Sequence, residues 1–489
     1  MLSLIVAHDT NFGIGKKNEL PWNLRRDLIN FRKITTNTKS DKSKINAVIM
    51  GRKTWDSLPE SVKPLPNRIN IVLTRNEDYL KKLYENTFYT DSIDTAIEYI
   101  NDYSSKILDK TINEIFIIGG SSIYKEVLKR DDLDKMYITE IYDDFNCDTK
   151  FCNKIDFDEK IKNFDLISCS DFDTQNDINF RFFTYQHVKY NNNCYKNLEE
   201  QQYLDLLYKI GMEGIKKEDR TGTGTISVFG ETQKFNLRNT FPLLTTKKMF
   251  LRGIFEELML YLRGQTDNKI LNEKGIHIWN GNTSREFLDK RKLFNYQEGD
   301  MGETYGFNFR HYGGEYRGCH HEYKKGTDGF DQLANVINLI KNNPESRRII
   351  INLWNPYTEY KAALPSCLCW YQFYVNPYKK ELSLMINIRS SDFFLANNWN
   401  VCTGALLVHL LCNLEDIDLT PGDLTVISGD THIYLNHLDQ VKINLERKAR
   451  PFPKLIIKDK KKNIEEFNFD DLHLIGYNPY PGIRAPMAV

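Results

Sequence analysis

The stretch "IFIIGGSSIY", residues 115–124, decides the architecture of the first half of the chain. An apolar run, then Gly119-Gly120, then a helix-compatible segment predict a strand, a tight turn and a helix. In this geometry backbone N–H groups and a helix N-terminus can receive a phosphate. Strand-like runs span residues 2–7, 45–50, 69–74, 114–118 and 136–142. Several of them lack polar alternation and predict a mostly parallel sheet covered on both faces.

The chain of 489 residues is long enough for two or more domains. Residues 180–189 predict a closing strand, and the polar, aperiodic "YNNNCYKNLEE" follows it. We therefore predict an α/β domain over 1–189, with a mixed, mostly parallel central sheet flanked by helices. A short linker over 190–198 and a second domain over 199–489 should follow.

The second domain differs in its pattern. Strongly apolar segments at 254–263 and 405–415 predict buried helices. Helices and strands alternate less regularly here, which favours an α+β fold. The strand-like segments are 348–354, 370–376, 382–388 and 424–428.

Composition excludes few functions. Lys+Arg and Asp+Glu both number 66, so the net charge indicates neither nucleic acid nor an anionic membrane as a required partner. No segment approaches the roughly 20 apolar residues of a membrane helix, and residues 1–9 predict a strand rather than a signal peptide. Nine scattered cysteines favour reduced thiols, so we expect a cytoplasmic protein.

The segment "GIGKKNELPWNLRRDLINFRK", residues 13–33, offers one candidate acid. Asn23 can cap a helix that places Asp27 and Phe31 one turn apart on one face. Asp27 is then either an exposed helix carboxylate or a lone carboxylate in a pocket, where it can accept two hydrogen bonds from an aminopyrimidine edge. This segment alone favours the exposed carboxylate.

Two more segments place cations after strands. "VIMGRKTWDSLP", residues 48–59, has Arg52, Lys53 and Thr54 directly after an apolar run, and "LTRN", residues 73–76, has Thr74 and Arg75. Arginines at such positions could hold an additional phosphate and favour NADPH over NADH.

In this order the segments resemble dihydrofolate reductase, over residues 1 to about 189. The resemblance implies reduction of 7,8-dihydrofolate by NADPH, with Asp27 assisting protonation and Arg68 holding the folate glutamate carboxylate. The other implied folate positions are Ala7, Trp22, Phe31 and Thr139. The implied cofactor positions are Ala7, Ile14, Arg52, Lys53, Thr54, Thr74, Arg75, Gly119, Gly120 and Tyr124.

In the second half, "LPSCLCW", residues 364–370, holds Cys367 and Cys369. A C-x-C pair in a strand has both side chains on one face with Cα atoms about 7 Å apart, which is poor disulfide geometry. Zinc needs about four ligands, and "CHH", residues 319–321, matches no common zinc spacing, so we expect no metal site. For Cys369 the favoured interpretation is a buried, inert thiol.

Cys367 has a stronger case as a nucleophile. A reactive cysteine must be a thiolate, which a nearby arginine stabilises. Arg220, Arg347-Arg348 and Arg389 stand in distinctive segments, and arginines that converge on one site indicate a bound phosphate. Each could instead be a solvated surface arginine, least so Arg389, which follows an alternating strand.

Six strings in the second half resemble thymidylate synthase, over about 199–489. They are "DRTGTGT", "FPLLTTKK", "YGFNFRHYG", "SRRIIINLWNP", "SGDTHIYLNH" and "PYPGIRAPMAV". The resemblance implies methylation of dUMP to dTMP by 5,10-methylenetetrahydrofolate, which serves as carbon donor and reductant. Cys367 then attacks uracil C6, and this turns C5 into an enolate-like carbon that accepts the methylene group.

The same resemblance implies roles for further residues. Glu257 organises proton transfer through water, Tyr305 serves removal of the C5 proton, and Arg389 and Asn400 complete the catalytic set. The implied dUMP ligands are Arg220, Arg389, Ser390, Asp392, Asn400, His432 and Tyr434, with Arg347 and Arg348 donated by the partner subunit of a homodimer formed through the synthase domain. The implied folate positions are Trp279, Asn282, Asp392 and the terminal Val489.

The chain departs from the synthase pattern at Leu368, where the family usually has histidine, and at 305–310 and 395–400. We predict a bifunctional enzyme of dTMP synthesis, similar to the bifunctional enzymes of protists and plants. The alternative is an active reductase fused to a catalytically weakened synthase-like module for dimerisation or nucleotide binding. RNA binding through the nucleotide pocket is a further alternative, which the neutral composition neither supports nor excludes.

Overall fold

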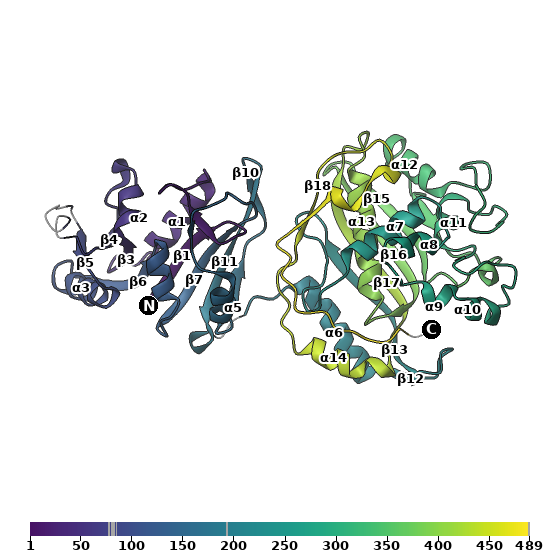
Figure 1. Cartoon of the computed structure of the whole chain (residues 1–489), viewed down its shortest axis with the longest axis horizontal. Helices are drawn as coiled ribbons and strands as arrows, with labels where there is room; N and C mark the ends of the chain where they lie inside the picture. The colour runs from purple at the N-terminus through teal and green to yellow at the C-terminus, as the bar shows by residue number, and fades with distance from the viewer. Residues whose placement is uncertain (77–78, 80–83, 85, 192–193, 488–489) are drawn as a thin grey trace. The chain divides into compact units, whose positions relative to one another are not determined.

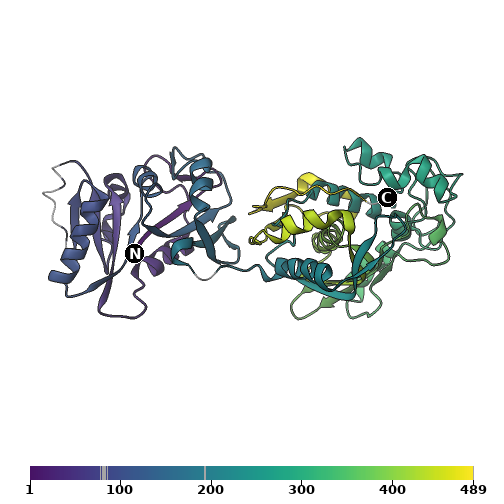
Figure 2. The ribbon, with the colours of Figure 1, turned by 90° about the horizontal axis from the view of Figure 1, so that it is seen from below.

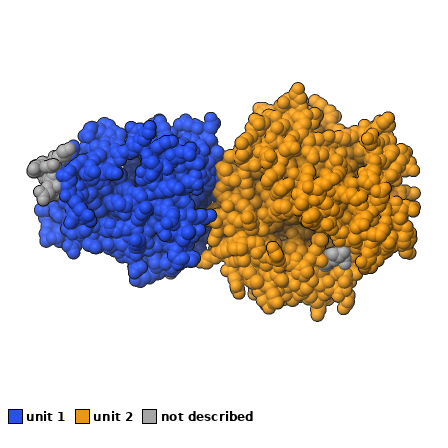
Figure 3. All heavy atoms as spheres, viewed as in Figure 1, with its two compact units in different colours: residues 1–195 blue, residues 196–489 orange. Residues whose placement is uncertain are grey.

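The computed structural model describes residues 1–76, 79, 84, 86–191 and 194–487. The chain forms two compact units, Met1–Tyr195 (unit 1) and Lys196–Val489 (unit 2), coloured separately in Figure 3. The division lies inside the segment 190–198 that we expected to be a linker. Each unit has its own hydrophobic core and is described separately below.

A mixed sheet organises unit 1. Its strands are β1 (Leu2–His8), β3 (Lys44–Gly51), β4 (Arg68–Leu73), β5 (Thr87–Thr90), β6 (Thr111–Ile117), β7 (Leu133–Ile141), β9 (Phe164–Cys169), β10 (Asp173–Gln175) and β11 (Ile178–His187). Within the described residues the order is β10-β11-β7-β1-β6-β3-β4-β5, with β9 beside β11 (Figure 1). The central pairs from β7 to β5 are parallel, whereas β11 runs antiparallel to β7. The predicted mixed, mostly parallel sheet is confirmed.

Helices cover both faces of this sheet (Figures 1 and 2). They are α1 (Arg25–Thr36), α2 (Arg52–Ser57), α3 (Ile93–Lys106), α4 (Ser121–Val127) and α5 (Lys154–Ile161); the short elements are η1 (Glu60–Val62), η3 (Val188–Tyr190) and the β2 (Gly13–Gly15) and β8 (Thr149–Lys150) pair. Leu4 and Ile49 enter a core with α3 and α4, and their neighbours Ile5 and Val48 enter a second core with α1 and α2. Burial on both faces explains why these strands lack polar alternation.

Two local predictions in unit 1 were wrong. Asn23 does not cap α1, because the N-cap residue is Leu24 and makes no side-chain cap bond. Instead, the Asn23 carbonyl accepts a hydrogen bond from the Asn176 amide at 3.1 Å, which ties this segment to the β10–β11 turn. The closing strand ends at His187 rather than 189, because η3 begins at Val188.

Unit 2 is built on a second sheet. Its strands are β12 (Ile215–Lys217), β13 (Thr225–Asn236), β14 (Ile350–Asn352), β15 (Leu368–Asn376), β16 (Glu381–Asp392) and β17 (Thr420–Tyr434), and β18 (Lys454–Ile457) pairs separately with β19 (Leu472–Ile475). The order is β12-β13-β17-β16-β15-β14. Only β16 and β17 run parallel among these described strands. A largely antiparallel sheet with helices grouped apart is the predicted α+β arrangement.

The core of unit 2 lies between one face of this sheet and buried helices. The helices are α6 (Leu198–Glu213), α7 (Leu251–Leu262), α8 (Lys269–Glu273), α9 (Asn280–Thr283), α10 (Arg285–Lys290), α11 (Tyr305–Arg310), α12 (Gln332–Asn342), α13 (Asn397–Cys412) and α14 (Leu438–Leu445), with short turns η4 (Glu359–Lys361), η5 (Leu435–His437), η6 (Ile464–Glu466) and η7 (Phe469–Asp471). Apolar residues of α7 and α13 pack against β15, β16 and β17. The helix predicted at 405–415 starts earlier and ends at Cys412, because the Asn413 side chain donates to the His409 carbonyl at 2.8 Å and caps it.

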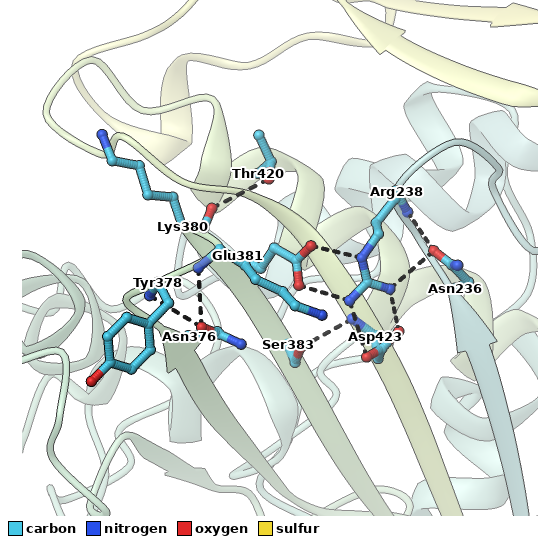
Figure 4. Close-up of polar contacts among 10 residues, drawn as sticks. Asn236, Arg238, Asn376, Tyr378, Lys380, Glu381, Ser383, Thr420 and Asp423 are labelled. Carbon is cyan, nitrogen blue, oxygen red and sulfur yellow. Dashed lines mark hydrogen bonds and ion pairs between the residues drawn. The ribbon is translucent and has the colours of Figure 1, made fainter.

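An arginine joins β13, β16 and β17 at one end of these strands (Figure 4). Arg238, two residues after β13, donates to both carboxylate oxygens of Glu381 at 2.7 Å. It also donates to Asp423 of β17 at 2.6 and 3.2 Å. These hydrogen bonds lower the pKa of Glu381 and of Asp423.

Among the described residues, no helix combines the length and the apolar character that crossing a bilayer requires.

Candidate active sites

Unit 1 contains a cavity of about 1100 Å³ at the carboxyl ends of its central strands. The cavity brings together residues of β1, β2, β7, α1, α2 and the turn between β6 and α4. The predicted site residues that line it are Ala7, Ile14, Asp27, Phe31, Lys53, Thr54, Gly119, Gly120, Tyr124 and Thr139.

Asp27 is the acid of this cavity. Thr139 Oγ1 donates a hydrogen bond to Asp27 Oδ1 at 2.7 Å. Burial raises the pKa of Asp27 to about 6, and the Thr139 hydrogen bond opposes that rise because it favours the charged form. Asp27 therefore faces a cavity rather than lying on an exposed helix surface, and near neutral pH it can exchange a proton with a bound molecule.

The turn between β6 and α4 brings bare backbone to the cavity. Gly119 has φ +112°, and a Cβ on it would lie 3.0 Å from the Tyr124 ring. A Cβ on Gly120 would lie 3.3 Å from Thr54 Oγ1. Because Gly119 and Gly120 leave room only for backbone, and Lys53 and Thr54 line the same cavity, these residues fit a phosphate-bearing dinucleotide.

Two predicted folate residues lie behind the cavity wall. Arg68 is buried, donates to the Pro66 carbonyl at 3.1 Å and has its guanidinium 5.8 Å from the Phe31 ring centre. Burial lowers the pKa of Arg68 to about 10. Trp22 is buried edge-on against Phe145, with ring centres 5.3 Å apart.

Three predicted cofactor residues lie outside the residues that line the cavity. Arg52, at the start of α2, forms an ion pair with Asp56 at 3.2 Å. The Thr74 N–H donates to the Thr90 carbonyl at 2.8 Å and so continues the β4–β5 pairing. Arg75 is exposed just beyond β4. The structure brings these residues to the carboxyl end of the sheet but not into the cavity.

In unit 2, Cys367 lies directly before β15 and is held through its backbone. Its N–H donates to Tyr305 Oη at 2.8 Å, and its carbonyl accepts from the Arg389 N–H at 2.9 Å. Arg389 Nε donates to the Ser366 carbonyl at 2.9 Å. Burial raises the pKa of the Cys367 thiol, and the positive charges of Arg389 and Arg220 oppose this rise. Arginine charge therefore favours the thiolate that a nucleophile requires.

The two cysteines of the C-x-C pair do not both lie in a regular strand. β15 begins only at Leu368, and its pairing with β16 shifts register between Leu368 and Trp370. This irregularity breaks the alternation that the prediction assumed. Cys369 is half-buried, and all nine cysteines are free thiols.

Glu257 of α7 is buried between two indoles. Its Oε1 accepts from Trp279 Nε1 at 2.7 Å and its Oε2 from Trp399 Nε1 at 2.6 Å. Burial raises the pKa of Glu257, and the two indole hydrogen bonds oppose this. The sequence did not reveal the role of Trp399, because 142 residues separate it from Glu257 and its segment read only as a departure from the synthase pattern.

Polar residues of β16 and β17 lie beside the cysteine. Asp392 pairs in register with His432, whose Nδ1 is 3.0 Å from Asp430 Oδ1. The rings of His432 and Tyr434 meet edge-on with centres 5.2 Å apart. Burial and the Asp392 charge raise the pKa of Tyr434 to about 12, with Arg220 opposing. The positive charge of Arg220 therefore lowers the pKa of both Tyr434 and Cys367.

The remaining predicted synthase residues have varied settings. Asn400 is half-buried in α13, and Ser390 is half-buried in β16. Asn282 is buried in α9. Arg347 and Arg348 are exposed just ahead of β14. Val489 lies outside the described residues.

Comparison with known proteins assigns each unit. The dihydrofolate reductase family matches residues 1–187, and the thymidylate synthase family matches residues 201–489. A bifunctional dihydrofolate reductase-thymidylate synthase of Zea mays is 40% identical over 516 residues, covering 99% of this chain and 96% of the relative. The Paramecium tetraurelia relative of the same name is 40% identical, covering 100% and 98%.

The chain belongs to the bifunctional dihydrofolate reductase-thymidylate synthase family. Unit 1 is its reductase domain, an oxidoreductase, and unit 2 is its synthase domain, a methyltransferase. The family assignment extends to a Leishmania major relative that is 38% identical over 100% of this chain. Within the synthase domain, Leu368 is 4% exposed and belongs to the main core, so the residue after Cys367 serves packing.

Proposed function

We propose that the two units catalyse consecutive reactions of dTMP synthesis. The synthase unit converts dUMP and 5,10-methylenetetrahydrofolate to dTMP and dihydrofolate. The reductase unit then reduces dihydrofolate to tetrahydrofolate with NADPH. The observation that carries this proposal is the presence in one chain of the cavity around Asp27 and of the cluster of Cys367, Tyr305 and Arg389.

In the reductase unit, Asp27 binds the pterin and supplies a proton to it, directly or through water. Thr139 orients the carboxyl and adjusts its pKa. NADPH, when bound, supplies the hydride. Lys53, Thr54 and the N–H groups at Gly119-Gly120 would hold its phosphates, because cationic and N–H donors face the cavity there.

In the synthase unit, Cys367 adds to C6 of the dUMP ring as a thiolate. Arg220, Arg389 and Ser390 would bind the phosphate, because arginine pairs with phosphate through two parallel hydrogen bonds. The other groups that we assign to dUMP are Asp392, Asn400, His432 and Tyr434.

Proton movements in the synthase unit fall to Glu257 and Tyr305. Glu257 has a raised pKa, which suits a group that both gives and takes protons. Tyr305 contacts the backbone of Cys367 and therefore lies beside the carbon chemistry. 5,10-Methylenetetrahydrofolate supplies the one-carbon group and the hydride; we assign Trp279, Asn282, Asp392 and Val489 to its pocket.

A homodimer through the synthase unit is supported by the outer face of its sheet. Tyr371 and Phe373 of β15 point into the core. Trp370 and Tyr374 on the same strand are 41% and 65% exposed, and Ile350 of the neighbouring β14 is 38% exposed. Large apolar side chains on a sheet face that points away from the core favour contact with a second copy.

Arg347 and Arg348 precede β14 on this side of the unit, where they could reach the dUMP phosphate of a partner. Mixing inactive Arg347→Ala and Arg220→Ala variants tests the shared site. Each active site that combines an intact Arg347 and an intact Arg220 from different chains should recover activity. Failure to recover activity despite demonstrated subunit exchange would refute the shared site.

Two spectrophotometric assays test the complete proposal, one for NADPH-dependent reduction of dihydrofolate and one for dihydrofolate formation from dUMP. Activity in only one of them overturns the bifunctional assignment. The second candidate is a synthase unit that binds nucleotide without turnover, and it is favoured by Leu368 standing where the family usually has histidine. A covalent complex of Cys367 with 5-fluoro-dUMP and methylenetetrahydrofolate separates the two, because a merely binding unit forms no adduct.

We further infer a cytoplasmic location from the nine free thiols.

A further inference from the structure

The segment Cys319-His320 has no part in either proposed site, yet the fold brings a third potential ligand to it. Asp267, beyond the end of α7, has a carboxylate oxygen that lies with Cys319 Sγ and a His320 ring nitrogen in one group, all within 4.8 Å of one another. We expected no metal site because the spacing within residues 319–321 fits no zinc pattern. That expectation could not include Asp267, which comes from a distant loop.

The distances suit a common metal ion. His320 Nδ1 lies 3.5 Å from Asp267 Oδ2, longer than a good hydrogen bond between these atoms. Two ligands bonded at about 2.0–2.2 Å to one tetrahedral zinc ion are separated by roughly 3.3–3.6 Å. The imidazole and the carboxylate are therefore already spaced for a shared ion.

A second carboxylate fixes the cysteine. Asp300 pairs with Asp267 in an isolated antiparallel bridge, and its Oδ2 accepts from the Cys319 N–H at 3.2 Å. Its Oδ1 accepts from the Gly302 N–H at 2.8 Å and from the Tyr316 hydroxyl. Asp300 is thus held by neutral donors and orients the loop that carries the thiol.

The local charge also favours a cation. Asp267 and Asp300 are 8% and 2% exposed, and Asp267 forms an ion pair with His320. A divalent cation would offset the two negative charges and would bind the thiolate as the thiol proton leaves.

We propose that Asp267, Cys319 and His320 form a zinc-binding site, with water as the fourth ligand and Asp300 as the group that orients Cys319. Thiolate and imidazole ligands select zinc over magnesium or calcium, which prefer oxygen ligands alone. His320 is 52% exposed in its side chain, so the ion can enter from solvent.

Cobalt titration of the metal-free, full-length protein tests the proposal. Co²⁺ should bind at one site per chain with a near-ultraviolet thiolate-to-cobalt absorption band, and Zn²⁺ should displace it. Cys319→Ser should abolish the band. Asp267→Asn and His320→Ala should weaken binding at least about ten-fold, in line with the loss of a ligand.

Matched controls separate this site from the other thiols and imidazoles. His321→Ala removes the adjacent imidazole, which packs edge-on against Tyr323 with ring centres 4.7 Å apart, and should leave cobalt binding unchanged. Cys367→Ser should also keep the band. The proposal fails if wild-type protein gives no band, if the band survives Cys319→Ser, or if His320→Ala, at an exposed position that should fold normally, binds Co²⁺ like wild type.

Discussion

The Thr139 hydroxyl lowers the pKa of Asp27 against the effect of burial, and Thr139→Val removes this contribution with little change in side-chain volume. The Thr139 hydroxyl donates to the carboxylate at 2.7 Å and opposes the burial that raises the pKa of Asp27 to about 6. A hydrogen bond to a charged group contributes about 1.5–3 kcal/mol, and one pKa unit corresponds to about 1.4 kcal/mol. The substitution should therefore raise the pKa of Asp27 by roughly one to two pH units.

The pH dependence of the reductase reports this pKa. Because the protonated carboxyl delivers the proton, kcat/KM for dihydrofolate should be constant at low pH and fall as pH rises through the pKa of Asp27. NADPH oxidation, followed by absorbance across the pH range, gives the inflection. In Thr139→Val it should lie roughly one to two pH units higher than in wild type.

Two controls accompany this measurement. Thr184→Val removes another hydroxyl from the same cavity and should leave the inflection in place. Asp27→Asn should abolish it and lower kcat/KM most below the wild-type inflection, where the wild-type carboxyl is protonated. An inflection in Thr139→Val that stays at the wild-type pH, or moves lower, would refute the assigned role of the Thr139–Asp27 hydrogen bond.

Three further outcomes follow from the contacts in unit 2. Cys367→Ser should abolish dihydrofolate formation from dUMP and leave NADPH-dependent reduction intact; turnover by this variant would contradict the nucleophile assignment. Leu368→Ala should lower the free energy of unfolding, measured in urea, by about 2–5 kcal/mol because it opens a core cavity, and a negligible loss would contradict its core role. Arg238→Met should cost about 1 kcal/mol near neutral pH, since these groups are partly exposed. Arg238 lowers the pKa of Glu381 and Asp423, so its stabilisation is present above their unfolded pKa values near pH 4 and disappears as pH falls. The thermal unfolding temperatures of variant and wild type should therefore converge in acid. A difference that grows as pH falls would contradict this assignment.

Much of the fold could be predicted from local patterns. The strands of the first sheet could be predicted from apolar runs, because both faces of the sheet are buried. Ile49 points into the core on one face and Ile5 into the core on the other. Helix ends were less predictable, because they depend on contacts outside the helix. The Asn176 side-chain amide donates a hydrogen bond to the Asn23 carbonyl just before α1, and the Asn413 side chain caps the C-terminus of α13.

The candidate site residues could be predicted from the sequence, but the surroundings of their side chains could not. Asp27, Lys53, Gly119 and Tyr124 were identified, and they do line one cavity. Arg52, Thr74 and Arg75 were assigned to the same cofactor yet lie outside that cavity. Sequence resemblance reports which residues a family uses, whereas the walls of a cavity depend on how loops pack around it.

The order of the two catalytic units, the candidate nucleophile Cys367 and the candidate acid Asp27 could be read from the chain, because contiguous motifs in a fixed order carry them. How these groups ionise and what surrounds them depends on the packing of distant segments. Thr139 is 112 residues from Asp27, and Trp399 is 142 residues from Glu257. Burial and hydrogen bonding set these pKa values, and both arise only when distant segments pack together. The meeting of Asp267 with Cys319 has the same origin.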